Sequence, residues 1–276
     1  MTRRVRLSVE GVAFKGYGVA RVDGKVVFVP YALTGDEAWG EIAEEKKTYS
    51  TARLIQMINP SPGRVTPPCP YFGSCGGCQW QHIDDSIQAE LKKEILEEIL
   101  KRLGALKEIP AILVVPSAKP YDYRARVQLK VRGGVLGYHQ ERSHRIVDVE
   151  RCAISHSLIN QIIRHLRDRR DALSPLEEVE INVSPEEGRG VLLLHPRSYD
   201  RRLDRFAEEF LESQSMVQGF AIAQKEGYQL FGDPTLSFTL PSTGQREEGE
   251  LRFRISPGSF FQVNPEQNQR LVRTVL

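Results

Sequence analysis

The sequence predicts an α+β protein of several domains, with a small OB-like β-barrel at the N-terminus and a mixed α/β central domain after it. Three observations lead to this prediction. The chain has 276 residues, which is enough for about two domains, or for three if one is small. Short alternating strand patterns fill the sequence up to about Gln56, whereas helical patterns appear only later. Hydrophobic residues make up 40% of the chain and charged residues 27%, a balance typical of globular proteins.

The barrel is assigned to residues 1–58. Polar and apolar residues alternate over residues 3–10, which is the pattern of a half-buried strand. An Asp-Gly pair at 23–24 stands between two apolar runs and indicates a two-residue hairpin turn, because this pair tolerates positive φ angles. Two further strands are predicted at residues 38–43 and 50–57. About five short strands in so short a segment are typical of a small closed or partly open barrel.

Residues 59–250 are assigned to the central domain. Its first helix has the clearest pattern in the sequence, with apolar residues at every fourth position from Ile87 to Leu103. Asp84 or Asp85 can cap the start of this helix, and Gly104 is a natural stop. Strands are predicted at 124–132, 135–139, 179–183, 190–194, 216–223 and 236–240, and helices at 157–173 and 199–211.

The last residues, 251–276, are predicted to begin a further domain with a strand at 251–255. Asn264 and Pro265 then form a good helix start, with Asn as the N-cap and Pro at the first helical position. The apolar residues that follow form a stripe along this helix, and nothing later in the sequence covers it. We therefore expect that the chain is truncated near the start of this domain.

The composition also limits where the protein works and what it binds. The longest apolar runs, residues 111–115 and 191–194, are far shorter than the roughly 20 residues of a membrane-spanning helix. No apolar signal core follows the basic N-terminus, so a cytoplasmic location without membrane contact is expected. The net charge is only +2, so any nucleic acid would be held by a local basic patch.

One predicted strand carries a candidate basic patch. Within residues 124–132, polar residues, nearly all cations, alternate with apolar ones, which puts the cations on one face of a strand. Neighbouring cations on such a face lie about 7 Å apart, which matches the phosphate spacing of a nucleic-acid strand. A solvated outer face of a sheet has the same pattern. The four candidate RNA contacts are Arg124, Arg126, Lys130 and Arg132.

The four cysteines point to a metal centre. In a chain without a secretory signal, grouped cysteines favour metal binding or catalysis over disulfides. Cys75 and Cys78 form a close pair, Cys69 lies just before them, and Cys152 is distant in the sequence. A glycine-rich loop can hold three corners of an iron–sulfur cluster while a distant loop supplies the fourth. The spacing leaves three interpretations open: a cluster, a zinc site, or unrelated buried cysteines.

Three segments resemble the motifs of one enzyme family. The segments CPYFGSCGGCQWQH (69–82), RCAI (151–154) and SPGSFFQVN (256–264) are similar to those of the RNA uracil-5-methyltransferases, in particular the branch that acts on bacterial 23S ribosomal RNA. The N-terminal segment resembles the TRAM domain that opens those enzymes. The resemblance implies a [4Fe-4S] cluster, with ligands Cys69, Cys75, Cys78 and Cys152.

The resemblance further implies an S-adenosyl-L-methionine-dependent methyltransferase that acts on ribosomal RNA. In this family a cysteine thiolate adds to C6 of a flipped-out uracil, C5 takes the methyl group, and a base removes the C5 proton. Carried over by motif, Gln262 would contact the methyl donor and Phe260 the target base. No obligate protein partner is implied.

Two parts of this reaction have no counterpart in the sequence. A cluster ligand is not free to attack C6, so the nucleophile must be a fifth cysteine, and the chain has four. The glycine-rich turn of a Rossmann-like methyltransferase domain is also missing. We therefore expect the nucleophile and the base beyond Leu276, and no turnover by residues 1–276 alone. The competing hypotheses are a stand-alone iron–sulfur RNA-binding protein without transferase activity and a zinc-ribbon adaptor.

Overall fold

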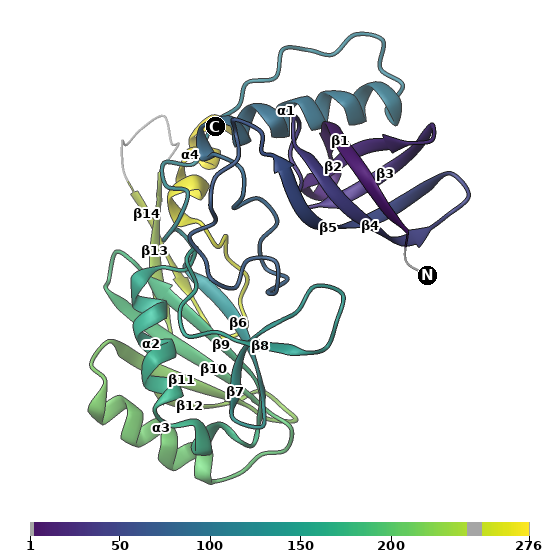
Figure 1. Ribbon diagram of the computed structural model, residues 1–276. Helices are drawn as coiled ribbons and strands as arrows, with labels where there is room; N and C mark the ends of the chain where they lie inside the picture. Colours follow the sequence, from purple (N-terminus) through teal and green to yellow (C-terminus); the bar gives the residue numbers. More distant parts are fainter. Residues whose placement is uncertain (1–2, 242–249, 276) are drawn as a thin grey trace. The chain divides into compact units, whose positions relative to one another are not determined.

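In the computed structural model, the N-terminal segment forms a closed five-stranded barrel, as its alternating pattern predicts (Figure 1). The strands are β1 (Arg4–Ala13), β2 (Tyr17–Val22), β3 (Lys25–Pro30), β4 (Glu37–Glu45) and β5 (Tyr49–Asn59). They follow the order β1-β2-β3-β5-β4, and only the β3–β5 pair is parallel. The inward side chains are fully buried, including Leu7, Val27, Val29 and Ala52.

The turns of the barrel follow from residues that tolerate positive φ. Asp23 and Gly24 join β2 to β3 with φ angles of 50° and 77°, so the predicted two-residue hairpin is confirmed. A short 3-10 turn, η1 (Phe14–Gly16), joins β1 to β2 and leaves the ring of Phe14 67% exposed.

The predicted helix after the cysteines is confirmed as α1 (Asp85–Arg102). Asp84 is its N-cap, and its side chain accepts a hydrogen bond from the backbone N–H of Ser86 at 2.9 Å. The backbone N–H of Gly104 donates to the carbonyl of Ile99, which closes the last turn. None of the side chains of α1 is fully buried, so its apolar stripe is only half covered.

The structure describes residues 3–241 and 250–275, and the chain divides into two compact units, Met1–Pro116 and Ser117–Leu276. The first unit holds the barrel, the three clustered cysteines and α1. The predicted domain limits at 58/59 and 250/251 differ from this division and stay predictions. Leu276, beyond which the nucleophile was expected, lies outside the described residues.

The second unit is built on a seven-stranded sheet with the order β12-β11-β10-β9-β6-β7-β8 (Figure 1). Its strands are β6 (Arg126–Arg132), β7 (Val135–His139), β8 (Ile146–Asp148), β9 (Leu176–Ser184), β10 (Arg189–Pro196), β11 (Val217–Ala223) and β12 (Tyr228–Gly232). Only β10 and β11 pair in parallel, and the crossover between them contains the helix α3 (Arg202–Ser213). The short strands β8 and β12, at the two ends of the sheet, were not predicted.

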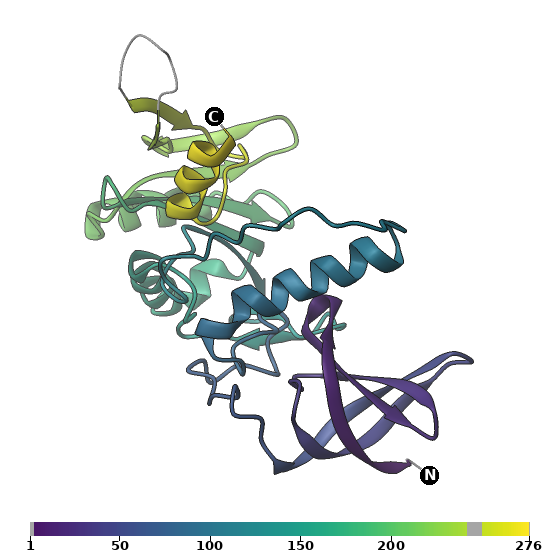
Figure 2. The same cartoon turned by 90° about the horizontal axis from the view of Figure 1, so that it is seen from above.

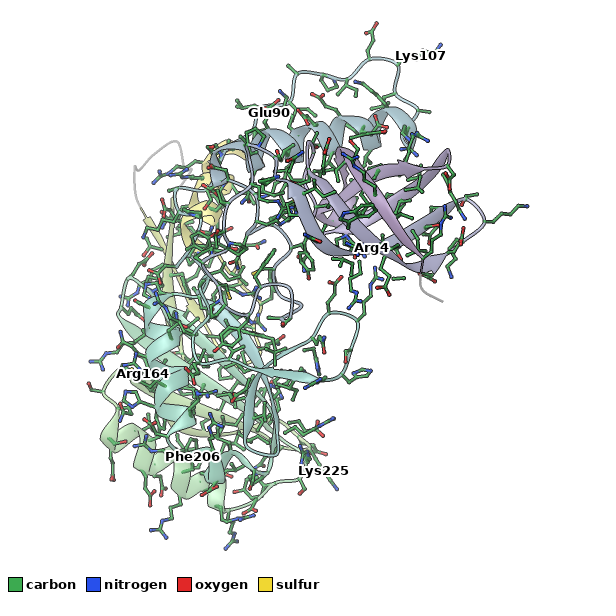
Figure 3. All side chains as sticks on the ribbon, in the orientation of Figure 1. Arg4, Glu90, Lys107, Arg164, Phe206 and Lys225 are labelled. Carbon is green, nitrogen blue, oxygen red and sulfur yellow. The ribbon has the colours of Figure 1, made fainter. Side chains whose placement is uncertain are left out.

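The main core lies between this sheet and the helices α2 (Ser157–Arg167) and α3. The apolar stripe of α2 is buried as predicted, with Ile159, Ile162, Ile163 and Leu166 fully covered. Figure 3 shows Phe206 on α3 turned toward the sheet and Arg164 on α2 turned away from it. The predicted helix over 157–173 is wrong after Arg167. Arg169 leaves helical geometry (φ −120°, ψ 32°), and a 3-10 turn, η2 (Arg170–Leu173), buries Leu173 instead.

The last described segment forms a hairpin and a helix, which Figure 2 shows side by side in yellow-green and yellow. The elements are β13 (Leu236–Pro241), β14 (Glu250–Ile255) and α4 (Pro265–Val275). The predicted cap is confirmed, because the side chain of Asn264 accepts a hydrogen bond from the backbone N–H of Gln267 at 3.0 Å. The ring of Phe238 on β13 lies 4.8 Å from that of Phe261, and both belong to the core of the second unit.

Candidate functional site

The alternation predicted for the basic strand is confirmed by burial. Ala125, Val127, Leu129 and Val131 are all buried, and the polar side chains between them project from the other face of the sheet. The paired strand β9 places acids directly opposite these cations, because Glu178 and Glu180 are in register with Lys130 and Gln128. Two of the four cations on this face, Arg126 and Lys130, are therefore paired with acids, which the sequence of β6 alone did not indicate.

The four predicted RNA contacts have different surroundings. The guanidinium of Arg126 pairs with Glu180, with Nη2 2.8 Å from Oε2, and its side chain is only 16% exposed. Lys130 forms an ion pair with Glu178 and is more accessible. Arg124 lies just before β6, and its Nε donates to the carbonyl of Arg126 at 2.8 Å. Arg132, at the far end of the strand, is exposed.

The segment 256–264, which joins β14 to α4, presents its aromatic residues in opposite directions. Phe261 is buried against Phe238, whereas Phe260 is 76% exposed and Gln262 is also exposed. This alternation is that of an extended chain, in which successive side chains point to opposite sides. The motif assigned a site role to Phe260 alone, and the structure leaves Phe260 exposed while the adjacent Phe261 belongs to the core.

A hollow of about 240 Å³ lies beside the exposed residues of this segment. It brings together Phe260 and Gln262, the two residues predicted to contact the base and the methyl donor. The hairpin β13–β14 supplies most of the other walls, including Leu240, Phe253 and Ile255. These wall residues were missed by sequence reasoning, although the apolar alternation of the two strands was the signal that could have found them.

The cysteine loop of the first unit is held by tight turns. The backbone N–H of Cys75 donates to the carbonyl of Tyr71 at 2.8 Å, and that of Gly77 lies 3.4 Å from the Cys75 sulfur. Cys69 and Cys78 are half-buried, as is Cys75, and none of the chain's four cysteines forms a disulfide. Within residues 3–241 and 250–275, no three Cys, His, Asp or Glu side chains are gathered closely enough to share a metal ion. Cys69, Cys75 and Cys78 belong to the first unit and Cys152 to the second, so the cluster stays a prediction.

Cys152, in the second unit, is held by a helix residue that sequence reasoning missed. The backbone N–H of Cys152 donates to Asn160 Oδ1 at 2.8 Å, and Asn160 Nδ2 donates back to the carbonyls of Cys152 and Ser155. Burial is the main cause that raises the pKa of the neighbouring Tyr138 hydroxyl well above its usual value, and the Cys152 thiol adds to it. Asn160 lies on α2, so the loop of Cys152 is fixed to the core.

Two buried groups lie where the barrel meets the chain that follows it: Asp36 binds the linker at Ser61 and Arg64, and the His82 ring lies 6.3 Å from that of Tyr31, just after β3. Asp36 is 1% exposed and accepts hydrogen bonds from the backbone N–H groups of Leu33 and Ser61 and from the side chain of Arg64. His82 is also buried, with its ring centroid 5.7 Å from that of Phe72. Burial, together with the smaller effect of the Arg64 charge, lowers the pKa of His82 to about 4, so the imidazole is neutral at pH 7.

Comparisons with known proteins agree with the predicted family. Residues 2–55 match the TRAM domain, which confirms the predicted identity of the barrel. The chain is 34% identical over 267 residues to an uncharacterized RNA methyltransferase of Aquifex aeolicus (strain VF5), covering 94% of this chain and 60% of that protein. It is also 34% identical over 281 residues to a 23S rRNA (uracil(1939)-C(5))-methyltransferase of Nitrosospira multiformis, covering 97% of this chain and 62% of the relative.

A solved structure shares the fold. The crystal structure of Pyrococcus abyssi tRNA (uracil-54, C5)-methyltransferase, in complex with S-adenosyl-L-homocysteine, superimposes with a TM-score of 0.72 at 20% identity. The match covers 98% of this chain and 64% of that one. No helix in the part of the chain that the structure describes is long and apolar enough to span a membrane. Over nearly its whole length the chain is thus similar to RNA methyltransferases, and it spans about three-fifths of the length of the curated relatives named above.

Proposed function

We propose that this chain belongs to an enzyme that methylates uracil C5 in 23S ribosomal RNA, with S-adenosyl-L-methionine as the methyl donor. The observation that carries the proposal is the convergence of Phe260 and Gln262 on one hollow. These are the residues that the motif assigns to the base and to the donor. Similarity to RNA methyltransferases over 94–97% of the chain supports the same activity.

The proposed chemistry is a covalent methylation. A thiolate adds to C6, C5 attacks the methyl group of the donor, a base takes the C5 proton, and the thiolate leaves with the restoration of the C5–C6 double bond. We assign the nucleophile to none of the four cysteines, because each is proposed as a cluster ligand. The role proposed for Phe260 is to stack on the flipped uracil, which its 76% exposure allows, and that for Gln262 is to offer its amide to the donor.

Methyl transfer by the protein that the whole gene encodes tests this proposal. With radiolabelled donor and 23S ribosomal RNA, we expect label at C5 of uridine, and a loss of about a hundredfold in rate for Phe260→Ala, because a misplaced base reacts far more slowly. The control is Leu113→Ala, which removes an apolar side chain that is 85% exposed and lies outside both the barrel and the hollow. If the label is found on the RNA but not on uridine, the proposal is contradicted. An unchanged rate for Phe260→Ala would contradict it as well.

Of the four cations predicted from the sequence as RNA contacts, Arg124, Arg126, Lys130 and Arg132, we propose that Arg132 and Lys130 hold the phosphates. Arg132 and Lys130 fit this role best, because Arg132 is exposed and Lys130 is partly so. Arg124 and Arg126 already bond to groups of the protein, so a phosphate would compete with those partners. The barrel is a second proposed RNA surface, since small barrels of this kind bind oligonucleotides.

We also propose that Cys69, Cys75, Cys78 and Cys152 bind a [4Fe-4S] cluster, which would hold two distant loops together. The donor chemistry fits, because four thiols outside disulfides are the usual ligands and Gly77 directs an N–H toward one of the sulfurs. Chemical analysis of the purified protein tests this proposal.

Iron analysis tests the cluster. Anaerobically purified protein is expected to contain about four irons per chain, and Cys75→Ser is expected to lose them, because the remaining thiolates cannot hold the cluster. Ser86→Ala, a substitution on α1, is the control and is expected to retain iron. Protein that contains zinc instead of iron would favour the zinc-ribbon hypothesis. Iron and RNA binding without methyl transfer by the whole gene product would favour the stand-alone RNA-binding protein.

A further inference from the structure

The segment 256–264 is fixed to the sheet at separate points. The backbone N–H of Ala125 donates to the carbonyl of Val263 at 2.7 Å, just before β6. Near the other end of the segment, Gly258 has a φ of +77° and lies so close to Tyr228 on β12 that a Cβ would be 2.6 Å from the tyrosine oxygen. The segment therefore lies close to the Tyr228 side chain of β12 and to the start of β6, and Figure 1 shows its yellow trace passing beside β6.

A buried carboxylate lies on the face of the sheet that carries the polar side chains of β6. Glu180 on β9 is 2% exposed, and its Oε2 accepts hydrogen bonds from Arg126 at 2.8 Å and from Gln128 at 3.0 Å. Its Oε1 accepts a hydrogen bond from Asn182 at 2.8 Å. A buried charge is costly unless it is paired and fully hydrogen-bonded, so this network holds the Arg126 guanidinium in one place.

The guanidinium of Arg126 also contacts the segment. Its Nη1 lies 3.5 Å from the carbonyl oxygen of Ser259, and its centre lies 5.9 Å from the centroid of the Phe261 ring. A planar guanidinium can bond to a carboxylate along one edge, donate to a carbonyl from another, and lie over an aromatic face. Arg126 makes all three contacts, which explains why this cation is largely covered.

We propose that Arg126 is a positioning residue for the segment 256–264. Held by Glu180, it fixes Ser259 and Phe261 against the sheet, so that Phe260 and Gln262, on either side of the buried ring, stand out at the hollow. The anchoring depends only on contacts within the second unit. Its value for catalysis rests on the function proposed above for Phe260 and Gln262.

The test observes the segment directly in residues 1–276. All 11 phenylalanines are labelled with 4-fluorophenylalanine, and the fluorine resonances of Phe260 and Phe261 are assigned with single leucine variants. Arg126→Met is expected to shift these two resonances and to raise amide hydrogen exchange in residues 257–263 by about tenfold or more, because local opening becomes easier. Lys130→Met removes a paired cation from the same face of the same strand and is expected to change neither readout.

A second variant keeps the test valid if Arg126→Met does not fold. In Arg126→Met/Glu180→Met both charges are replaced by apolar side chains, which proteins tolerate far better than one unpaired buried charge. The segment should loosen in this variant as well. Unchanged exchange in residues 257–263 and unchanged Phe260 and Phe261 resonances, in either folded variant, would overturn the proposal.

RNA binding separates this role from a phosphate contact. Each contact to single-stranded RNA contributes about 0.7 to the slope of log affinity against log salt. A positioning role predicts the wild-type slope for Arg126→Met, whereas a slope lowered by about 0.7 with an unchanged segment would make Arg126 an RNA contact and overturn the proposal. If the whole gene product transfers no methyl group but the segment still loosens in Arg126→Met, the positioning role stands and the proposed function falls.

Discussion

Replacing Asp36 with alanine is expected to lower the free energy of unfolding of the first unit by about 3–5 kcal/mol, because the change leaves a buried cation without its partner. Asp36 is 1% exposed, and the Arg64 side chain that pairs with it is 17% exposed. The substitution also leaves the backbone N–H groups of Leu33 and Ser61 without their acceptor. Urea unfolding of the purified protein, followed through Trp39 and Trp80, measures the loss.

The pH dependence of the same unit gives an independent check. Burial raises the pKa of Asp36, but the hydrogen bonds from Arg64, Ser61 and Leu33 together lower it more, so it lies below its usual value. The ionised Asp36 therefore stabilises the folded unit fully at pH values above about 3.9, the pKa of an aspartate in the unfolded chain. This stabilisation is lost as the pH falls through the lower pKa that Asp36 has in the folded unit. Asp36→Asn should be less stable at neutral pH and should lose less stability on acidification. Equal acid sensitivity of Asp36→Asn and the wild type would contradict this account.

Replacing Phe220 with alanine is expected to destabilise the second unit by about 3–5 kcal/mol, because it leaves a large cavity in a packed core. Phe220 is fully buried on β11, and its ring lies 5.5 Å from that of Phe210 and 5.9 Å from that of Phe206, both on α3. Thermal and urea unfolding measure the change.

The control for Phe220 is Phe14→Ala. The ring of Phe14 is 67% exposed in the first unit, so its loss should change the free energy of unfolding by less than about 0.5 kcal/mol. If both variants unfold at the same urea concentration as the wild type, α3 does not depend on β11 for its stability. The helix–sheet packing described above would then be wrong.

Local patterns predicted the elements whose partners lie nearby in the sequence. The Asp-Gly turn at Asp23, the cap at Asp84 and the cap at Asn264 depend on a few adjacent residues, and all three are confirmed. The alternation of β6 was also confirmed, because burial on one side of a strand leaves a period of two. The three-residue strand β8 was missed, since so short a strand forms no pattern of its own.

The site was harder to predict, because its contacts join residues that are distant in the sequence. The cations of β6 were read as an unbalanced face, whereas Glu178 and Glu180 pair with them from another strand. The sequence of β6 alone does not show which residues of β9 lie opposite it. The motif identified Phe260 and Gln262 without showing that Phe261 turns inward, since only the contacts with Phe238 and Arg126 determine which ring is buried. The cluster and the RNA contacts stay predictions.

The two units differ in how far apart in sequence their paired strands lie. In the barrel, β1, β2 and β3 are successive and joined by short turns, whereas 54 positions separate Arg126 on β6 from Glu180 on β9. Closing a long loop costs entropy before the contact forms, and such distant pairings slow folding. The barrel can therefore form while the ribosome is still making the central sheet. The segment that carries Phe260 can be held by Arg126 only after β6 and β9 have paired, because Glu180 on β9 fixes that guanidinium.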